Sequence, residues 1–510
     1  MIDIMIDLQG GAKAPLYEKI YRHIKNEIVE GRIPRGEKLP STRLLARNLG
    51  VSRSTASLAY DQLLAEGYIE AESCRGFFVC DITELYRLGA GSRGGGDWSL
   101  GESETAGKED WGRNTRRELK AGSDAWCAGA EDGPSKLPAL DFSPYLIDTK
   151  HFPYNIWRKI SRNVLLDDRE DLLLAGDGQG EWELRGVIAG YLHQARGVNC
   201  SPADIILGAG NEYLEILLTQ ILGAGRAVLM EDPGYPQAHR TFSNAGYRVE
   251  TVAAGDGLTV DRVRQINPDL VYVMPSHQFP IGTIMPLGLR LELLRWAAEA
   301  KERYIVEDDH DSEYRYRGKP IPALQSVDGC GKVIYLGTFS KSIAPALRIS
   351  YMVLPPQLME RYHDVCGFYS ATVPRMQQET LKEFMREGHF ERHLNKMRGI
   401  YRNRHDFLLG ELKRRGWAQK ISGEHAGLHL LVQVDTVLSE DEICRSARER
   451  GVKLSGISRY RLAEADRGRK EKKGAGQTTL LLGYGKLSEE QICRGLMILD
   501  EILERAQKGE

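Results

Sequence analysis

A long stretch without any hydrophobic period divides this chain into two unequal parts. Residues 88–138 contain the segments GAGSRGGG, GESETAGKEDWG and GAEDGPSK, where glycine, serine and charges of both signs replace the apolar residues that a core needs. Such a composition is typical of a linker. Because 510 residues exceed what one hydrophobic core organises, we predict a small domain at 12–81, a linker at 82–138 and a larger domain at 139–510.

The first part has the pattern of a helix, a helix-turn-helix and a two-stranded wing. Apolar residues recur on one helical face from Leu16 to Ile28, and two further helical patterns meet at the turn residue Gly50. Ser41 and Ser52 have the side chains that cap helix starts. Two short strands are expected at 68–70 and 76–79, joined by a turn at 73–75.

Positive charge is concentrated in this small domain. The whole chain has a net charge of −2, so any nucleic-acid contact must come from a local patch. Residues 32–53 supply one, with six arginines and lysines against the single acid Glu37. In a helix-turn-helix the second helix enters the major groove with its first residues foremost, and Arg53 is best placed to fork onto a guanine edge. The expected DNA contacts are Arg43, Ser52, Arg53, Ser54, Thr55 and, at the wing tip, Arg75.

The second part alternates helical and apolar-strand patterns from Phe142 onward. Examples are the helices EWELRGVIAGYLHQA, NEYLEILLTQIL and LGLRLELLRWAAEAKE and the strands DIILGAG, AVLMED, LVYVMP, YIVED and VIYLGTFS. This alternation predicts an α/β fold with a mainly parallel sheet covered on both faces. From about Val373 the chain is more helical, with strands at LHLLVQV and TLLLGYG, which indicates a smaller C-terminal subdomain.

One lysine of this part has neighbours that suit a phosphorylated aldehyde. Lys341 in GTFSKSIAPALR follows Thr338 and Ser340 and precedes Arg348, and these three offer hydroxyls and a guanidinium to a phosphate. A lysine amine joined to pyridoxal phosphate also needs a carboxylate for the ring nitrogen and a flat side chain to stack on. Asp308, at the end of an apolar strand, and Tyr235, after EDPG, are the candidates.

Two other features bear on this site. The strand that ends at Gly210 runs directly into a helix, and helix starts bind phosphate through their free backbone N–H groups. The acids of EDDHDSE leave a second interpretation open, because Asp308, Asp309, His310 and Asp311 would also suit a metal cation.

The first part resembles the GntR-type winged helix over residues 15–80, on the stretch LPSTRLLARNLGVSRSTASLAYDQLLAEGYIEAESCRGFFV. The second resembles the fold-type I aminotransferases on GDGQGEWELRGVIAGYL, EDPGYP, PSHQFPIG, EDDHDSEYRY and GTFSKSIAPALR, in family order. Together they resemble the MocR-type regulators. The resemblance implies a pyridoxal 5′-phosphate cofactor, with Lys341 as the internal-aldimine lysine and Asp308 at the ring nitrogen. It further implies a phosphate clamp formed by Arg348, Thr338 and Ser340. The phosphate-binding helix start would be Gly210, Asn211 and Glu212, and the ring that stacks on the cofactor would be Tyr235.

The sequence departs from the family pattern at three places. His310 stands where the family usually has a tyrosine that bonds the phenolic oxygen of the cofactor, and Ile281 replaces the threonine of P-T-G. The late arginine that binds a substrate carboxylate is missing from its strand, LLLG. Arg459 is the candidate to replace it, with Arg461 as its competitor.

Two functions stay open for the whole chain. In one, the aminotransferase-like domain senses an amino compound through external aldimine formation and alters DNA binding by the head. In the other, it is a working aminotransferase with an appended DNA-binding head. A cofactor-free dimerisation body is a third option, against which Lys341, Asp308 and Arg348 argue. We favour the regulator, because an enzyme needs no DNA reader, and the resemblance implies a homodimer on double-stranded operator DNA.

The chain also has features that exclude other classes of protein. Its eight cysteines are scattered, without metal-ligand spacing, so we expect reduced thiols and no metal site. No apolar run reaches the roughly 18 residues that a membrane span requires, and the start lacks the basic and apolar regions of a signal peptide. We therefore expect a cytoplasmic protein.

Overall fold

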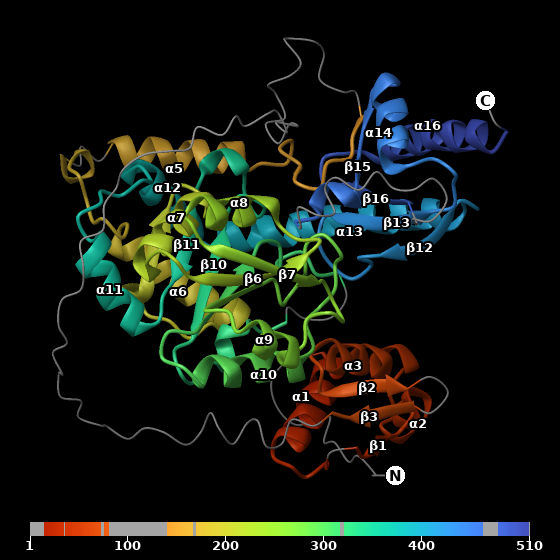
Figure 1. Ribbon diagram of the computed structural model, residues 1–510, viewed down its shortest axis with the longest axis horizontal. Coiled ribbons are helices and arrows are strands. Elements are labelled where there is room, and N and C mark those ends of the chain that lie inside the picture. Colours follow the sequence, from red (N-terminus) through yellow and green to blue (C-terminus); the bar gives the residue numbers. More distant parts are fainter. Residues whose placement is uncertain are drawn as a thin grey trace.

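The computed structural model describes residues 15–34, 36–72, 76–80, 140–166, 170–316, 321–462 and 478–508. It contains a small N-terminal head, a large layer built on a central sheet, and a second sheet near the C-terminus (Figure 1). The predicted linker at 82–138 lies outside the described residues, as does Arg75.

The head is a winged helix-turn-helix. Its elements are α1 (Leu16–Val29), β1 (Lys38–Leu39), α2 (Thr42–Asn48), α3 (Arg53–Ala65), β2 (Ile69–Glu72) and β3 (Gly76–Val79). The three strands pair in the order β1-β3-β2, and β1 is a strand that the sequence did not indicate. Both predicted caps are confirmed, because Ser41 accepts from the Leu44 amide at 3.2 Å and Ser52 from the Thr55 amide at 3.1 Å.

A seven-stranded sheet forms the centre of the large layer, in the order β5-β11-β10-β9-β8-β6-β7. Only β11 runs antiparallel to its neighbours, so the prediction of a mainly parallel sheet is confirmed. The strands are β5 (Ile205–Gly208), β6 (Ala227–Asp232), β7 (Arg248–Ala253), β8 (Leu270–Val273), β9 (Tyr304–Asp309), β10 (Val333–Thr338) and β11 (Ser350–Val353).

Helices cover both faces of this sheet because successive strand residues point to opposite sides. In β9, for example, Val306 packs with α7, α8 and α11, whereas Ile305 packs with α9 and α10. Helices α5, α6 and α12 enclose a further core over β5 and β11. The helices are α5 (Tyr154–Leu166), α6 (Trp182–Arg196), α7 (Asn211–Leu222), α8 (Pro236–Asn244), α9 (Val260–Ile266), α10 (Leu287–Ala298), α11 (Pro356–Cys366) and α12 (Arg375–Arg386).

The second sheet is antiparallel, with strand order β12-β13-β16-β15. The two predicted strands are its neighbours β13 (His429–Val434) and β16 (Thr478–Gly483). The segment after the linker also joins this unit, because β4 (Leu140–Asp141) pairs with β14 (Val452–Lys453). The remaining elements are α13 (His389–Lys413), β12 (Ala418–Ser422), α14 (Glu440–Glu449), β15 (Ser455–Gly456) and α16 (Glu489–Lys508).

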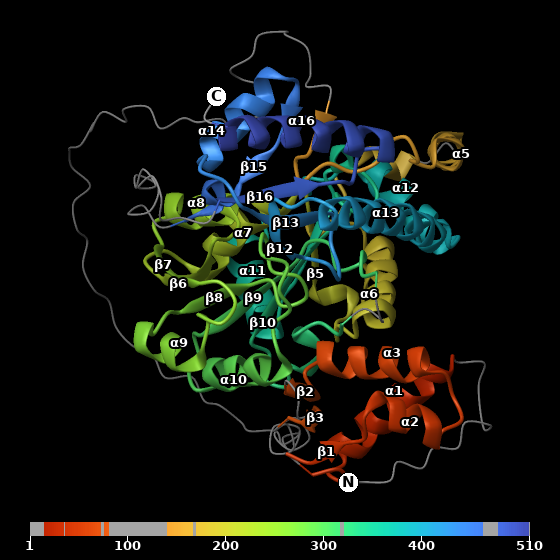
Figure 2. The same ribbon diagram turned by 90° about the vertical axis from the view of Figure 1, so that its right-hand side faces the viewer.

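The head packs against α10 of the large layer. Leu287 and Leu291 of α10 belong to the same hydrophobic cluster as Ile20 and Tyr68 of the head, and both leucines are 8% exposed. Gly67 approaches so closely that a Cβ on it would lie 2.7 Å from the Leu287 nitrogen. Figure 2 shows the head beneath α10, with α3 nearest to the large layer.

Candidate functional site

The candidate cofactor residues meet at one edge of the central sheet, where its parallel strands end. Gly210 follows β5, Tyr235 follows β6, Asp308 lies at the end of β9 and Lys341 follows β10. In a parallel α/β sheet this carboxyl edge is where ligands bind, because the loops there converge on one crevice. Residues more than a hundred positions apart in the sequence are thereby brought together.

Lys341 has a partly buried amine that is held in place by backbone and ring contacts. Its Nζ donates to the Pro144 carbonyl oxygen at 3.1 Å and lies 5.2 Å from the centre of the Tyr145 ring. Burial lowers the pKa of Lys341, while the charges of Asp311 and Asp308 oppose that shift. A lowered pKa makes the unprotonated amine more available as a nucleophile toward an aldehyde.

Asp308 is 3% exposed, and its hydrogen-bond partners Tyr272 and Asn211 are both uncharged. The Tyr272 hydroxyl donates to Oδ2 at 2.6 Å, and Asn211 donates to Oδ1 at 3.4 Å. Burial raises the pKa of Asp308, although His310 and Tyr272 work against this. A buried carboxylate of this kind fits a protonated pyridine nitrogen, with which it would form an ion pair.

An arginine and several small groups form a cradle for an anion. Arg348 adopts the left-handed conformation with φ 49°, and its Nη2 donates to Glu212 at 2.7 Å and to the Ala209 carbonyl at 3.2 Å. Glycine suits position 210, because its φ of 104° is one that other residues rarely adopt and a Cβ on it would displace the Arg348 guanidinium. Glu212 thus contacts Arg348, a role that the sequence did not indicate.

The two hydroxyl residues before Lys341 are also ordered at this edge. Ser350 and Thr338 share a hydrogen bond of 2.9 Å, and the Ser340 amide donates to Thr338 Oγ1 at 3.1 Å. Together with the start of α7 at Asn211, they add hydroxyl and amide donors beside the Arg348 guanidinium. This set fits the phosphate of pyridoxal phosphate.

Tyr235 and His310 line the same region. Tyr235 precedes α8 and meets Phe279 edge to face with ring centres 6.3 Å apart, and burial raises its pKa well above the ordinary value. His310 contacts Phe279 in the same edge-to-face manner, with ring centres 6.1 Å apart. Phe279 therefore contacts both of the aromatic groups that the sequence assigned to the cofactor.

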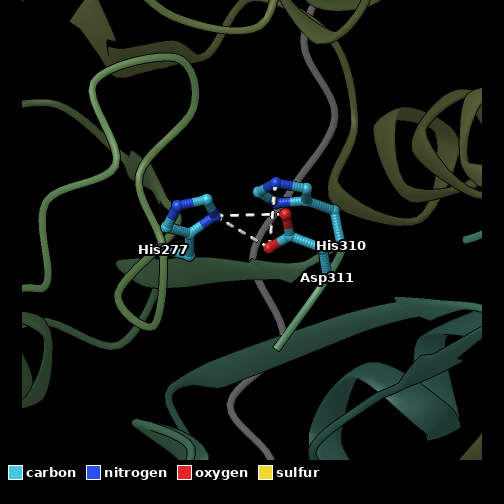
Figure 3. Close-up of side chains that lie close together, drawn as sticks. All are labelled: His277, His310 and Asp311. Atoms are coloured by element: carbon cyan, nitrogen blue, oxygen red, sulfur yellow. Dashed lines mark hydrogen bonds and ion pairs between the residues drawn. The ribbon is translucent and has the colours of Figure 1, made fainter. Parts of the chain in front are cut away.

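The acidic loop after β9 does not converge as a four-residue cation site. Asp309 turns to the other face, where it forms a 2.7 Å ion pair with Arg196. His310 and Asp311 instead lie near His277, with one ligand-type atom of each within 4.8 Å of the others. Asp311 contacts both histidines, as Figure 3 shows.

Sequence reasoning missed several residues of the site. Tyr145 and Tyr272 carry no motif, and their positions follow only from tertiary contacts with Lys341 and Asp308. His277 lies in the quoted segment PSHQFPIG, but nothing in that pattern connects it with the loop after β9. Of the two late arginines, Arg459 is exposed and lies close enough to Tyr145 to act on the pKa of that phenol, which burial raises.

The predicted DNA-contacting residues of the described head lie on its surface. Arg43, Ser52, Arg53 and Ser54 are exposed, and Thr55 is partly buried. The Ser52 hydroxyl also lies 2.8 Å from those of Ser54 and Thr55, so the cap forms a hydroxyl cluster at the start of α3. This exposed start of the second helix is the part that a helix-turn-helix presents to the major groove.

Comparisons with known proteins match each part of the chain separately. The family profile "Aminotransferase class I and II" matches residues 139–470, and "Bacterial regulatory proteins, gntR family" matches residues 16–79. The chain is 37% identical to the uncharacterized HTH-type transcriptional regulator YdeL of Bacillus subtilis, over 90% of this chain and 92% of that protein. It is 33% identical to the probable rhizopine catabolism regulatory protein MocR of Rhizobium meliloti, over 89% of each.

A solved structure agrees with the fold of the second part. LysN, the α-aminoadipate aminotransferase of Thermus thermophilus complexed with N-(5′-phosphopyridoxyl)-L-leucine, superposes with a TM-score of 0.62 at 26% identity. The match covers 73% of this chain and 93% of that one. Among the described residues, no helix is long and apolar enough to cross a membrane.

Proposed function

We infer the role of this chain from the family to which it belongs: it is a MocR-like HTH-type transcriptional regulator with a gntR-type DNA-binding head and a class I and II aminotransferase domain. It depends on pyridoxal 5′-phosphate. We propose that its domains span residues 12–81 and 139–510, with the smaller subdomain from about 373. A partner in double-stranded DNA also favours the cytoplasm as its location.

We propose that the aminotransferase-like domain senses a small amino compound. The amino nitrogen of the effector would bond to the aldehyde carbon of the cofactor, and the Lys341 amine would leave as a free amine. The observation that carries this proposal is the partly buried Lys341, whose charge interacts with that of Asp308 at the end of the neighbouring strand. The cofactor, when bound, supplies an electron-withdrawing ring, and Asp308 would hold its nitrogen protonated.

The other site residues have proposed roles around this pair. Arg348, Thr338, Ser340 and the helix start at Gly210, Asn211 and Glu212 would hold the phosphate, and Tyr235 and His310 would contact the ring. Arg459 would bind the effector carboxylate, because its position beside Tyr145 brings it near Lys341. In the head, Arg43, Ser52, Arg53, Ser54, Thr55 and Arg75 would contact DNA.

We also propose that the protein is a homodimer. Several large apolar side chains around α5, α7 and α11 are exposed in the single chain, among them Leu165, Leu166, Leu173, Leu174, Ile216 and Phe368, at 50–76%. Exposed apolar side chains of this size favour a protein partner. A second copy would bury them, and two heads would then suit a repeated or palindromic operator.

An absorbance titration with amino acids tests the proposed sensing. The purified protein should show a visible band from the lysine-bound cofactor, and the effector should change this band and the affinity for upstream DNA together. A regulator and an enzyme differ in the next measurement, which is steady-state turnover with a keto acid. Rapid multiple turnover without any effector-dependent change in DNA binding would overturn the sensing role and favour an aminotransferase.

A further inference from the structure

A buried carboxylate links two histidines next to the cofactor residues. Asp311, which follows β9, is 1% exposed, and His277, which follows β8, is 3% exposed. The Nδ1 of His277 lies 3.0 and 3.1 Å from the two oxygens of Asp311, and the Nε2 of His310 lies 3.2 Å from one of them. Figure 3 shows both histidines joined to the same carboxylate by dashed lines.

This geometry fixes the proton position on His277 and places a negative charge beside Nε2 of His310. Burial disfavours an ionised Asp311, but the two imidazoles outweigh this effect and hold its pKa well below the ordinary range. An ionised carboxylate can only accept hydrogen bonds. The proton on His277 therefore sits on Nδ1. Nε2 of His310 lies at ion-pair distance from the same carboxylate without a hydrogen bond to it, so the charge of Asp311 favours a proton there, and Nδ1 of His310 is its remaining ring nitrogen.

The charge on His310 then decides what Nδ1 can do. A neutral imidazole protonated on Nε2 would present a lone pair at Nδ1, whereas a doubly protonated ring would present a second N–H donor. Burial lowers the pKa of His310, but Asp311 and Asp308 outweigh burial and Lys341, so the net pKa is raised. The other nearby histidine, His429, remains neutral, because burial and His277 lower its pKa to about 3.

The packing around His277 holds its ring in this orientation. A Cβ on Gly427 would lie 2.9 Å from both ring nitrogens of His277, and one on Gly282 would lie 3.3 Å from Nε2. The His277 and His310 rings are stacked, with centres 5.9 Å apart. Both glycines leave the space that His277 needs to reach Asp311.

We propose that Asp311, oriented by His277, keeps His310 doubly protonated so that Nδ1 donates a hydrogen bond to the phenolic oxygen of the cofactor. This inference rests on the proposed function, since it needs the cofactor at this site. That oxygen carries negative charge when the cofactor is joined to a lysine, so it needs a donor and would repel a lone pair. Asp311 and His277 are thus positioning residues. They keep His310 able to donate this hydrogen bond, whereas a tyrosine hydroxyl could donate it without a neighbouring carboxylate.

The test compares Asp311→Asn in two backgrounds, the wild type and His310→Tyr. The readout is the pH midpoint of the visible absorbance of the cofactor-loaded protein. With His310 present, losing Asp311 removes a cation near the cofactor, so protonation of the lysine-bound nitrogen becomes easier and the midpoint rises by about one pH unit. With Tyr at 310 no cation depends on Asp311, and the loss of a negative charge leaves the midpoint unchanged or lowers it.

His277→Gln should raise the midpoint in the same direction as Asp311→Asn, by a smaller amount. The matched control is Asp406→Asn, which removes the carboxylate that lies 2.9 Å from His405, a buried histidine outside the site. This control should leave the midpoint unchanged. A rise of equal size in both backgrounds, or none in either, would overturn the proposal and leave the sensing role intact.

A second measurement uses the cofactor-free protein and so stays decisive if no visible band forms. In histidine-labelled protein, NMR titration should place the pKa of His310 at least one pH unit lower in Asp311→Asn than in the wild type. An unchanged His310 pKa would contradict the proposal that Asp311 keeps His310 doubly protonated. Metal analysis of the purified protein is the third arm, because one tightly bound transition metal per chain would mean that the three side chains are ligands.

Discussion

The DNA-binding head and the candidate cofactor site place their predicted functional residues in opposite surroundings. Arg43 and Arg53 of the head are exposed to solvent, whereas Asp308 and Asp311 of the candidate cofactor site are 3% and 1% exposed. An exposed arginine costs the fold little and is ready for DNA phosphates and bases. A buried carboxylate opposes folding unless it is paired, so its position has to be maintained by neighbours such as Tyr272 and His277.

This difference in burial indicates which substitutions should affect DNA binding and which should affect the cofactor. Binding by the head depends on which side chains its surface carries and on how the head is placed. Chemistry at the candidate cofactor site depends on pKa values that burial and neighbouring charges have shifted. Substitutions in one region should therefore leave the basic property of the other unchanged, and the following predictions test that separation from the largest expected effect to the smallest.

Lys341→Ala should abolish the visible absorbance of the bound cofactor and every spectral response to amino compounds, because it removes the amine that would bond to the cofactor. DNA binding by the effector-free protein should persist. Absorbance spectroscopy and a gel-shift titration measure the two properties. Lys341→Arg serves as the charge-retaining control and should give the same spectral loss. A visible band that survives in Lys341→Ala would contradict the assignment.

Glu231→Gln should stabilise the large domain at high pH. Burial raises the pKa of Glu231 to about 7, against the hydrogen bond from the Gly255 amide. The folded state thus binds a proton that the unfolded state has released, and stability falls as pH rises from about 4.5 to 7. Removing this group should raise the free energy of unfolding by up to about 3 kcal/mol at pH 8, and by little at pH 4.

Urea unfolding at both pH values measures this change. Glu250→Gln is the control on the neighbouring strand β7, since its side chain is 43% exposed. It should alter stability little at either pH. An equal gain for Glu231→Gln at pH 4 and pH 8 would show that the raised pKa is not its cause.

Arg53→Ala should weaken binding to the specific operator about 10- to 100-fold, which corresponds to the loss of one good base contact. The absorbance of the bound cofactor should not change. Arg22→Ala is the control, because Arg22 is 65% exposed on α1 of the head and paired with Glu18 at 2.6 Å. Fluorescence anisotropy with labelled DNA measures both variants, and equal losses would indicate a nonspecific charge effect.

Arg348→Ala should lower cofactor affinity about tenfold, since one charge-assisted hydrogen bond to a phosphate is lost. Binding of pyridoxal phosphate to the cofactor-free protein, followed by absorbance, measures this effect. Arg361→Ala on α11 is the control, as Arg361 lies 3.4 Å from Glu302 at the surface. Unchanged affinity in Arg348→Ala would remove this residue from the phosphate site.

Local patterns predicted most of the fold. The caps Ser41 and Ser52 and the strand that carries Asp308 near its end depend on residues close in the sequence, and each was predicted correctly. The pairing of β4 with β14 was not predicted, because it joins Leu140 to Val452 across three hundred residues. The hydrophobic periodicity of a sequence does not indicate which distant strands pair.

The candidate site was predicted only where a motif carries its chemistry. Lys341 and Arg348 lie in one segment, and the structure brings that segment to the Asp308 strand. Tyr145, Tyr272 and His277 had no signal, because an isolated tyrosine or histidine has the same local pattern in a core as in a site. The role of Asp311 follows from contacts across β8 and β9, which become visible only when the sheet is assembled.

Helix α10 contributes side chains to two separate hydrophobic clusters. One side of it, with Leu287 and Leu291, closes the interior of the head, while Leu293 and Trp296 on the other side pack on the strands that lead to Asp308. Separating the head from α10 would expose Leu287 and Leu291 to water, at a free-energy cost on the order of 3 kcal/mol. Effector binding that releases the head must therefore supply at least this free energy at the interface between the head and α10.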